Sequence, residues 1–214
     1  NRVTLSTTAD SDSDGLTSDE TGETVQDAGG NDIITGGGSI DTINVEGGTN
    51  NVTGGAGADI ITLGTSANGT DTIDAGEGDD VIALADISDL TSADSITGGA
   101  GTDTLKATEA AALDLSALNN LSGIDKIEVN GAQTVTVDDA NVDQSDSDSI
   151  TITETGTNAN ITVSAAVGAA YTVIIDNDGQ TTTLANGVDN RVTLSTTADS
   201  DSDGLTSDET GETV

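Results

Sequence analysis

Glycine, aspartate and a large aliphatic residue recur in this chain at a spacing of nine residues. Residues 54–62 and 98–106 both read G-G-x-G-x-D-x-U-x, where U is a large aliphatic residue. Residues 27–35, 36–44 and 75–83 keep most of this pattern. Ordinary Gly/Asp turns are the alternative interpretation, but turn chemistry alone explains no fixed period. The period therefore predicts a solenoid of short repeated units.

Each fixed position of the nonapeptide has a physical role. Glycine allows tight turns with positive φ, which bring carbonyl oxygens close together. Aspartate adds a carboxylate, and Ca²⁺ prefers six to eight such oxygen ligands. The aliphatic residue lies two places after the aspartate, and side chains of a strand alternate between its faces, so it points into the core. The pattern predicts short strands joined by turns that bind calcium.

Over residues 27–106 the chain resembles the RTX (repeats-in-toxin) family. In that family two nonapeptides complete one coil, so the resemblance implies that turns 18 residues apart stack and share a calcium ion. The implied fold is all-β, a right-handed parallel β-roll or β-helix stapled by several calcium ions per repeat. Asn50 and insertions at 63–68 and 84–92 depart from the pattern on one edge. The implied metal ligands are Asp32, Asn50, Asp71 and Asp94 on that edge, and Asp41, Asp59, Asp80 and Asp103 on the other.

A second acidic motif precedes the nonapeptides. Residues 10–15 read D-x-D-x-D-G, the core of an EF-hand-type calcium loop, and they also resemble bacterial thrombospondin type 3 loops. The twelfth position holds Thr21 instead of a bidentate glutamate. We predict that this loop binds calcium; a solvated acidic loop is the alternative. The predicted ligands are Asp10, Asp12 and Asp14, and in a second copy of the loop Asp199, Asp201 and Asp203.

That second copy belongs to a longer duplication. Residues 1–25 recur without a change at 190–214, 189 positions later. We interpret this as a tandem array of near-identical 189-residue units, with an introduced duplication as the alternative. The expected organisation is an acidic loop and first coils at 1–26, the nonapeptide β-roll at 27–106, further solenoid coils at 107–189 and the start of the next repeat at 190–214. A small β-sandwich is the alternative for 107–189.

Composition limits the molecules that such a solenoid could bind. The chain has 39 acidic residues, four basic ones, no histidine and a net charge of −35. This charge excludes a phosphate-neutralising nucleic-acid surface and argues against binding to or insertion into anionic membranes. It also opposes compaction, so we expect the chain to need bound calcium in order to fold. Without cysteine, disulfides are not available as staples.

The same composition argues against catalysis. Histidine and cysteine chemistry is missing, and with no Phe or Trp there is no aromatic platform for stacking sugars. We therefore expect no enzyme activity. A ligand-binding adhesion module is the main competing interpretation, and an ice-binding threonine ladder is a weaker one. The expected function is a calcium-dependent structural repeat on the bacterial cell surface. Identical repeats would assemble end to end or laterally into a filament or S-layer-like lattice; the alternative is a stalk repeat of a giant RTX adhesin. As the resemblance implies, such chains leave the cell unfolded by type I secretion and fold in external calcium.

Overall fold

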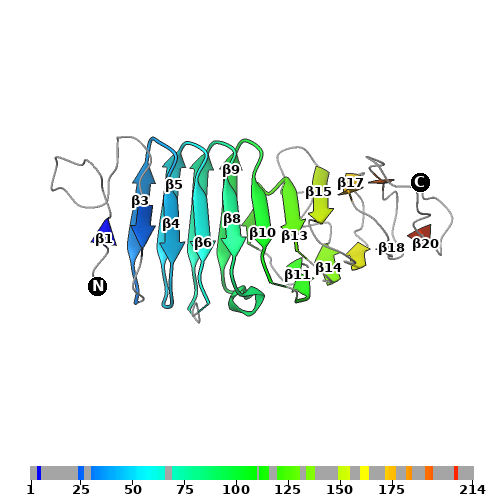
Figure 1. Ribbon diagram of the computed structural model, residues 1–214, viewed down its shortest axis with the longest axis horizontal. Coiled ribbons are helices and arrows are strands. Elements are labelled where there is room, and N and C mark those ends of the chain that lie inside the picture. Colours follow the sequence, from blue (N-terminus) through cyan, green and yellow to red (C-terminus); the bar gives the residue numbers. More distant parts are fainter. Residues whose placement is uncertain are drawn as a thin grey trace.

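The computed structural model is an elongated stack of β-coils (Figure 1). It describes residues 4–5, 24–26, 30–65, 69–109, 111–115, 120–130, 134–137, 149–154, 160–163, 172–176, 182–184, 191–194 and 205–206. These residues form twenty strands in three sheets and one short 3-10 helix, η1 (Ile87–Asp89). Among them, no helix has the length and hydrophobicity needed to cross a bilayer.

The longest sheet, which we call sheet A, runs along the whole stack. Its neighbouring strands are parallel except at the β1–β2 pair, which is antiparallel. In order, they are β1 (Thr4–Leu5), β2 (Thr24–Gln26), β4 (Thr42–Val45), β6 (Ile60–Leu63), β8 (Val81–Leu84), β10 (Thr104–Ala107), β13 (Lys126–Val129), β15 (Ser149–Glu154), β17 (Thr172–Asp176) and β19 (Arg191–Leu194).

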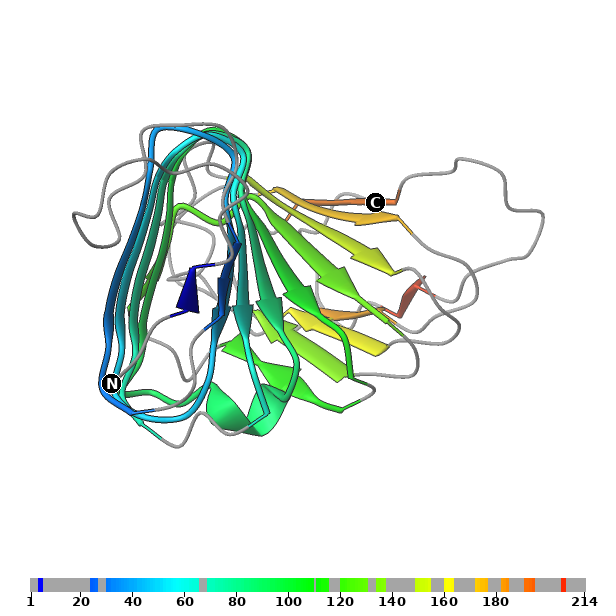
Figure 2. The same cartoon turned by 60° about the vertical axis from the view of Figure 1, so that its left-hand side comes forward.

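Two shorter parallel sheets complete the coils. Figure 2 shows sheet B as the wall facing the first strands of sheet A, and sheet C as the wall facing its later strands. Sheet B contains β3 (Ile33–Gly37), β5 (Asn51–Ala56), β7 (Thr72–Glu77), β9 (Ser95–Ala100) and β12 (Leu121–Ser122). Sheet C contains β11 (Leu113–Asp114), β14 (Thr134–Val137), β16 (Asn160–Val163), β18 (Thr182–Leu184) and β20 (Leu205–Thr206).

The core is a set of aliphatic ladders between the sheets. In sheet A the aliphatic position of each nonapeptide is a register partner of the next, as in the series Ile43, Ile61, Ile82, Leu105 and Ile127, all fully buried. Sheet B contributes a facing ladder of Ile34, Val52, Ile73 and Ile96. Burying such a side chain contributes about 1.5–3 kcal/mol, so repetition along the stack supplies the driving force for folding.

Inserted residues lengthen the coils without shifting this register. Successive stacked aspartates are 18, 21 and then 23 residues apart, yet the aliphatic partners stay aligned. Part of the longest insertion forms η1, whose first turn is capped by Asp86: Oδ1 accepts hydrogen bonds from the Ser88 hydroxyl at 2.6 Å and the Ser88 N–H at 2.9 Å. These two bonds hold the pKa of Asp86 below its ordinary value. The insertion protrudes at one edge because the core strands keep their pairing.

Candidate metal sites along two edges of the solenoid

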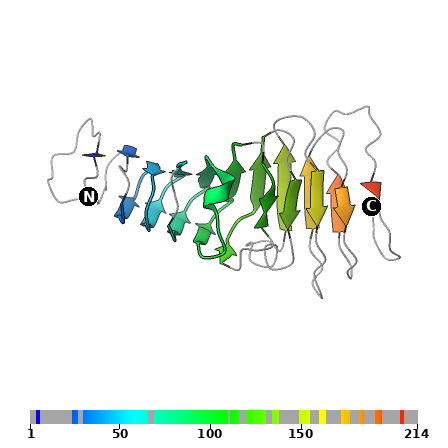
Figure 3. The same ribbon diagram turned by 90° about the horizontal axis from the view of Figure 1, so that it is seen from below.

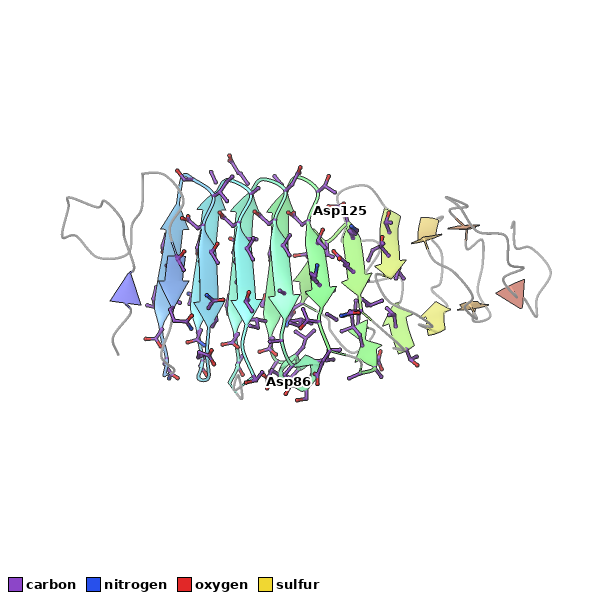
Figure 4. All side chains as sticks on the ribbon, in the orientation of Figure 1. Asp86 and Asp125 are labelled. Carbon is purple, nitrogen blue, oxygen red and sulfur yellow. The ribbon has the colours of Figure 1, made fainter. Side chains whose placement is uncertain are left out.

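Two rows of turns run along the stack, one on each side of the core. The first row, which we call the glycine edge, joins sheet B to sheet A through residues 38–41, 57–59, 78–80 and 101–103. The second row, the insertion edge, joins sheet A to sheet B through turns that include 46–50 and 85–94. In Figure 4, Asp125 lies in the upper row of turns, the glycine edge, and Asp86 in the lower row, the insertion edge.

The aspartates of the glycine edge form a hydrogen-bonded ladder. The N–H of Asp41 donates to Oδ1 of Asp59 at 2.7 Å, and the N–H of Asp59 donates to Oδ1 of Asp80 at 2.7 Å. Asp80 in turn donates to Oδ1 of Asp103 at 2.8 Å. Each of the four side chains is at most 1% exposed. In this part of the stack, each coil therefore places one buried carboxylate directly beside the backbone of the previous coil.

The insertion edge has the same ladder but fewer available carboxylate oxygens. The N–H of Asp32 donates to Oδ1 of Asn50 at 3.1 Å, Asn50 to Asp71 at 2.8 Å, and Asp71 to Asp94 at 2.7 Å. Asn50 brings an amide, which donates to the carbonyl of Glu46 at 3.0 Å. Oδ2 of Asp94 accepts two further hydrogen bonds, from the N–H and hydroxyl of Thr91. A cation on the insertion edge would therefore meet less negative charge than on the glycine edge. It would also meet fewer carboxylate oxygens, because one carboxylate is replaced by the amide of Asn50 and Oδ2 of Asp94 already accepts hydrogen bonds from Thr91.

On the glycine edge the second carboxylate oxygen points into buried space. Oδ2 of Asp59 and Oδ2 of Asp80 are buried and accept no hydrogen bond from any residue that the structure describes. A buried polar atom without a partner is costly. Accordingly, burial raises the pKa of Asp59 to about 6; the Asp41 N–H opposes this shift, and the charges of Asp80 and Asp41 add to it. Burial also raises the pKa of Asp80 and, on the insertion edge, of Asp71.

Missing side chains at glycine leave room beside these oxygens. A Cβ on Gly54 would overlap the carbonyl oxygen of Ala75 and lie 2.6 Å from Oδ2 of Asp59. A Cβ on Gly36 would likewise overlap the Gly54 carbonyl oxygen and lie 2.6 Å from Oδ2 of Asp41. A carbonyl oxygen of the next coil and a carboxylate oxygen thus meet beside each glycine. These are the hard oxygen donors that Ca²⁺ prefers.

This geometry fits calcium if the main chain supplies part of the ligand shell. Among the described residues, no three His, Cys, Asp or Glu side chains converge. Each coil contributes one carboxylate to this edge. An ion bound between two coils would therefore need backbone carbonyl oxygens of the glycine turns as its other ligands. A bound divalent cation would also reverse the unfavourable electrostatics of Asp59 and Asp80, because it favours their ionised forms.

Residues 22–64, 65–84 and 86–108 match the family model of the RTX calcium-binding nonapeptide repeat, with four copies. This segment is made of RTX repeats. The match confirms the resemblance drawn from the nonapeptides, and the parallel β-solenoid agrees with it. RTX repeats bind calcium, so the matched residues form a repeat segment of the calcium-binding RTX type. No curated protein and no solved structure matches the chain.

The structure places the eight nonapeptide ligands on two edges, in the stacking order expected from the RTX spacing. Their binding of metal stays a prediction.

Asp125 extends the glycine-edge ladder and was not among the predicted ligands: its Oδ2 accepts a hydrogen bond from the N–H of Asp103 at 3.0 Å. Residues 123–127 read G-x-D-x-U, the second half of a nonapeptide, and this signal could have identified it. The predicted loop ligands Asp10, Asp12, Asp14, Asp199, Asp201 and Asp203 lie outside the described residues.

Proposed function

We propose that this protein is a calcium-dependent structural repeat of a secreted bacterial cell-surface protein. It would serve as a rigid element of a self-assembling filament or S-layer-like lattice. The observation that carries the proposal is the glycine-edge ladder, in which each coil presents a buried carboxylate to the backbone of its neighbour. Ions bound between coils would join the stack along its axis and stiffen it.

The energetics support calcium as the folding switch. The chain carries a net charge of −35, and its ladder brings buried carboxylates into successive coils. With a site affinity of about 10⁻⁴ M, as in extracellular modules, and millimolar calcium, each site adds roughly 1.4 kcal/mol. Several sites together are comparable with the whole stability of a small domain. Such a chain stays unfolded in low intracellular calcium and folds outside the cell, which suits export by type I secretion.

A stalk repeat of a giant RTX adhesin is the second candidate. The duplicated residues 1–25 and 190–214 favour it, because covalent repetition alone would extend such a stalk. In the filament or lattice, separate copies of the chain associate; in the stalk they do not need to. The two candidates share the calcium-dependent solenoid and differ in self-association.

A calcium titration of the isolated chain tests the proposal. Circular dichroism and light scattering would be recorded on the same samples, with electron microscopy at saturation and Mg²⁺ as the matched control ion. We expect a coil-to-β transition with Ca²⁺ and not with Mg²⁺, since Mg²⁺ releases its water ligands reluctantly. Fibres or sheets would favour the filament or lattice, and folded monomers the stalk. A chain that is fully β-structured after calcium removal would contradict calcium-dependent folding.

A further inference from the structure

One sequence in this chain is paired in two different ways. Residues 2–5 and 191–194 are both Arg-Val-Thr-Leu. The second copy is β19, which pairs in parallel with β17 and places Leu194 opposite Ile175. In the first copy, Thr4 and Leu5 form β1, which pairs antiparallel with β2. Since the sequences are identical, the neighbouring structure decides the direction.

The C-terminal copy continues the solenoid in a second sheet as well. Leu205–Thr206 forms β20, which pairs in parallel with β18 in sheet C. The copy therefore has the pairing of an ordinary coil, one strand in each of two sheets. Figure 3 shows β20 at the C-terminal end of the stack, with the N-terminal end far from it.

The two ends of sheet A belong to one aliphatic ladder. Register partners connect Val25 of β2, through one aliphatic residue per strand, to Leu194 of β19. Beyond β19 the ladder would continue in the same register if Leu194 met Val25 of a second copy, with Thr193 opposite Thr24. The nine parallel strands from β2 to β19 would then join the next nine without a change in pairing direction.

At the N-terminal end, β1 covers the edge of β2 that this junction needs. Its pairing consists of two residue pairs, Thr4 with Gln26 and Leu5 with Val25. An open strand edge is a template for pairing with another chain, and proteins commonly cover such edges. A two-residue pairing is a weak cover, because it contributes few hydrogen bonds.

We propose that β1 is a displaceable cover, and that β19 of a second copy of this chain replaces it on β2 in parallel register. This inference deepens the proposed function, on which it depends, by naming the two edges that meet and the segment that must move. The same pairing of β19 with the next β2 would join successive repeats within one chain. The cover keeps single molecules apart until a preceding coil, covalent or not, templates the parallel arrangement.

Cysteine pairs test the junction, since the natural chain contains no cysteine. In T24C/T193C the two positions lie on the second and the last strand of a ten-stranded sheet, so a disulfide between them must join two molecules. Paired strands lie about 4.8 Å apart, within the Cα separation that a disulfide requires. In calcium we expect a ladder of disulfide-linked oligomers on a non-reducing gel, with the 24–193 link identified by mass spectrometry. T62C/T193C is the matched control, because Thr62 lies on β6 inside the stack and reports random collision.

A second variant tests the cover itself. In T4C/Q26C a disulfide would lock β1 on β2, because Thr4 and Gln26 are register partners. We expect the oxidised form to stay monomeric in calcium and the reduced form to assemble. Deletion of residues 1–23 should raise the 24–193 cross-linked fraction several-fold. An oxidised T4C/Q26C protein that assembles as well as the reduced one would overturn the role of β1.

Circular dichroism of the same samples separates the two proposals. If neither T24C/T193C nor the natural chain gains β structure in calcium, the proposed function is wrong. If the variant folds and assembles but its cross-links are no more frequent than those of T62C/T193C, only the junction between β19 and β2 is overturned. If it folds but remains monomeric, the junction between separate molecules and the filament or lattice are both overturned, and calcium-dependent folding stands.

Discussion

The backbone N–H of Asp41 donates a 2.7 Å hydrogen bond to Oδ1 of Asp59, the aspartate 18 residues further along the chain. One carboxylate oxygen of Asp59 is thereby committed to holding two coils together, while Oδ2 accepts no hydrogen bond from the described residues. The same residue is a structural tie between coils and a candidate calcium ligand. This double use predicts that the ladder is costly without a cation and is stabilised by one.

Asp59→Asn should separate these two roles. The amide oxygen can still accept the Asp41 N–H, but the buried charge and one anionic ligand are lost. We expect the calcium concentration at the folding midpoint to rise roughly tenfold, because ligand charge tunes calcium affinity. In calcium-free buffer the variant should be more β-structured than the natural chain. Asp74→Asn is the matched control, since Asp74 is exposed on β7; equal effects of the two changes would point to net charge alone.

Asn50→Asp should have the opposite effect on the insertion edge. The change completes the row of carboxylates between Asp32 and Asp71 but removes the hydrogen bond from Nδ2 to the carbonyl of Glu46. We expect lower stability without calcium and tighter or additional calcium binding, measured by isothermal titration calorimetry. Asn51→Asp, at an exposed neighbouring position, controls for the added charge. Unchanged calcium binding in Asn50→Asp would show that the insertion edge does not hold the ion.

Gly54→Ala should damage the glycine edge by overlap. The new Cβ would meet the carbonyl oxygen of Ala75 and Oδ2 of Asp59, the two oxygens that border the candidate site. Overpacking of this kind costs about 1–3 kcal/mol, and the site would also lose room for an ion. Chemical denaturation and a calcium titration would measure both losses. Gly38→Ala is the control, because nothing lies within 4 Å of a Cβ there; similar losses in both variants would argue against a local effect.

The calcium-free protein should lose β structure as the pH rises. Burial raises the pKa of Asp59 from 3.8 to about 6, so the folded state binds its proton more tightly than the unfolded state does. This stabilisation is fully present below pH 3.8 and is lost as the pH rises through about 6. Asp71 and Asp80 shift in the same direction.

Circular dichroism on resin-treated, calcium-free protein at constant ionic strength would measure this dependence. Asp59→Asn should flatten it, and saturating calcium should reverse its sign, because protons then compete with the ion for the carboxylates. β content that rises with pH between 3.8 and about 6 in the absence of calcium would contradict the raised pKa of Asp59.

Much of the ladder could be predicted from spacing. The pairing of Asp41 with Asp59 follows from two nonapeptides per coil, and the pairing of Asp80 with Asp103 survives inserted residues because the aliphatic partners keep their register. Asp125 was missed because Asn120 and Leu121 stand where a full nonapeptide has its first two glycines, leaving only the half pattern from Gly123 onward. Stacking on the preceding coil, which sequence spacing does not reveal, brings its carboxylate to Asp103.

The sequence by itself determined the repeat: glycines that permit tight turns, one aspartate per turn and an aliphatic residue two places later are local requirements of each coil. Tertiary structure alone decided which oxygens remain uncommitted, because Asn50 and Asp94 on one edge find hydrogen-bond partners that the Oδ2 atoms of Asp59 and Asp80 do not find among the described residues. It also decided the direction of the duplicated strand. Arg-Val-Thr-Leu is identical in both copies, so the parallel pairing of β19 with β17 and the antiparallel pairing of β1 with β2 are set by the neighbouring strands and not by the local sequence.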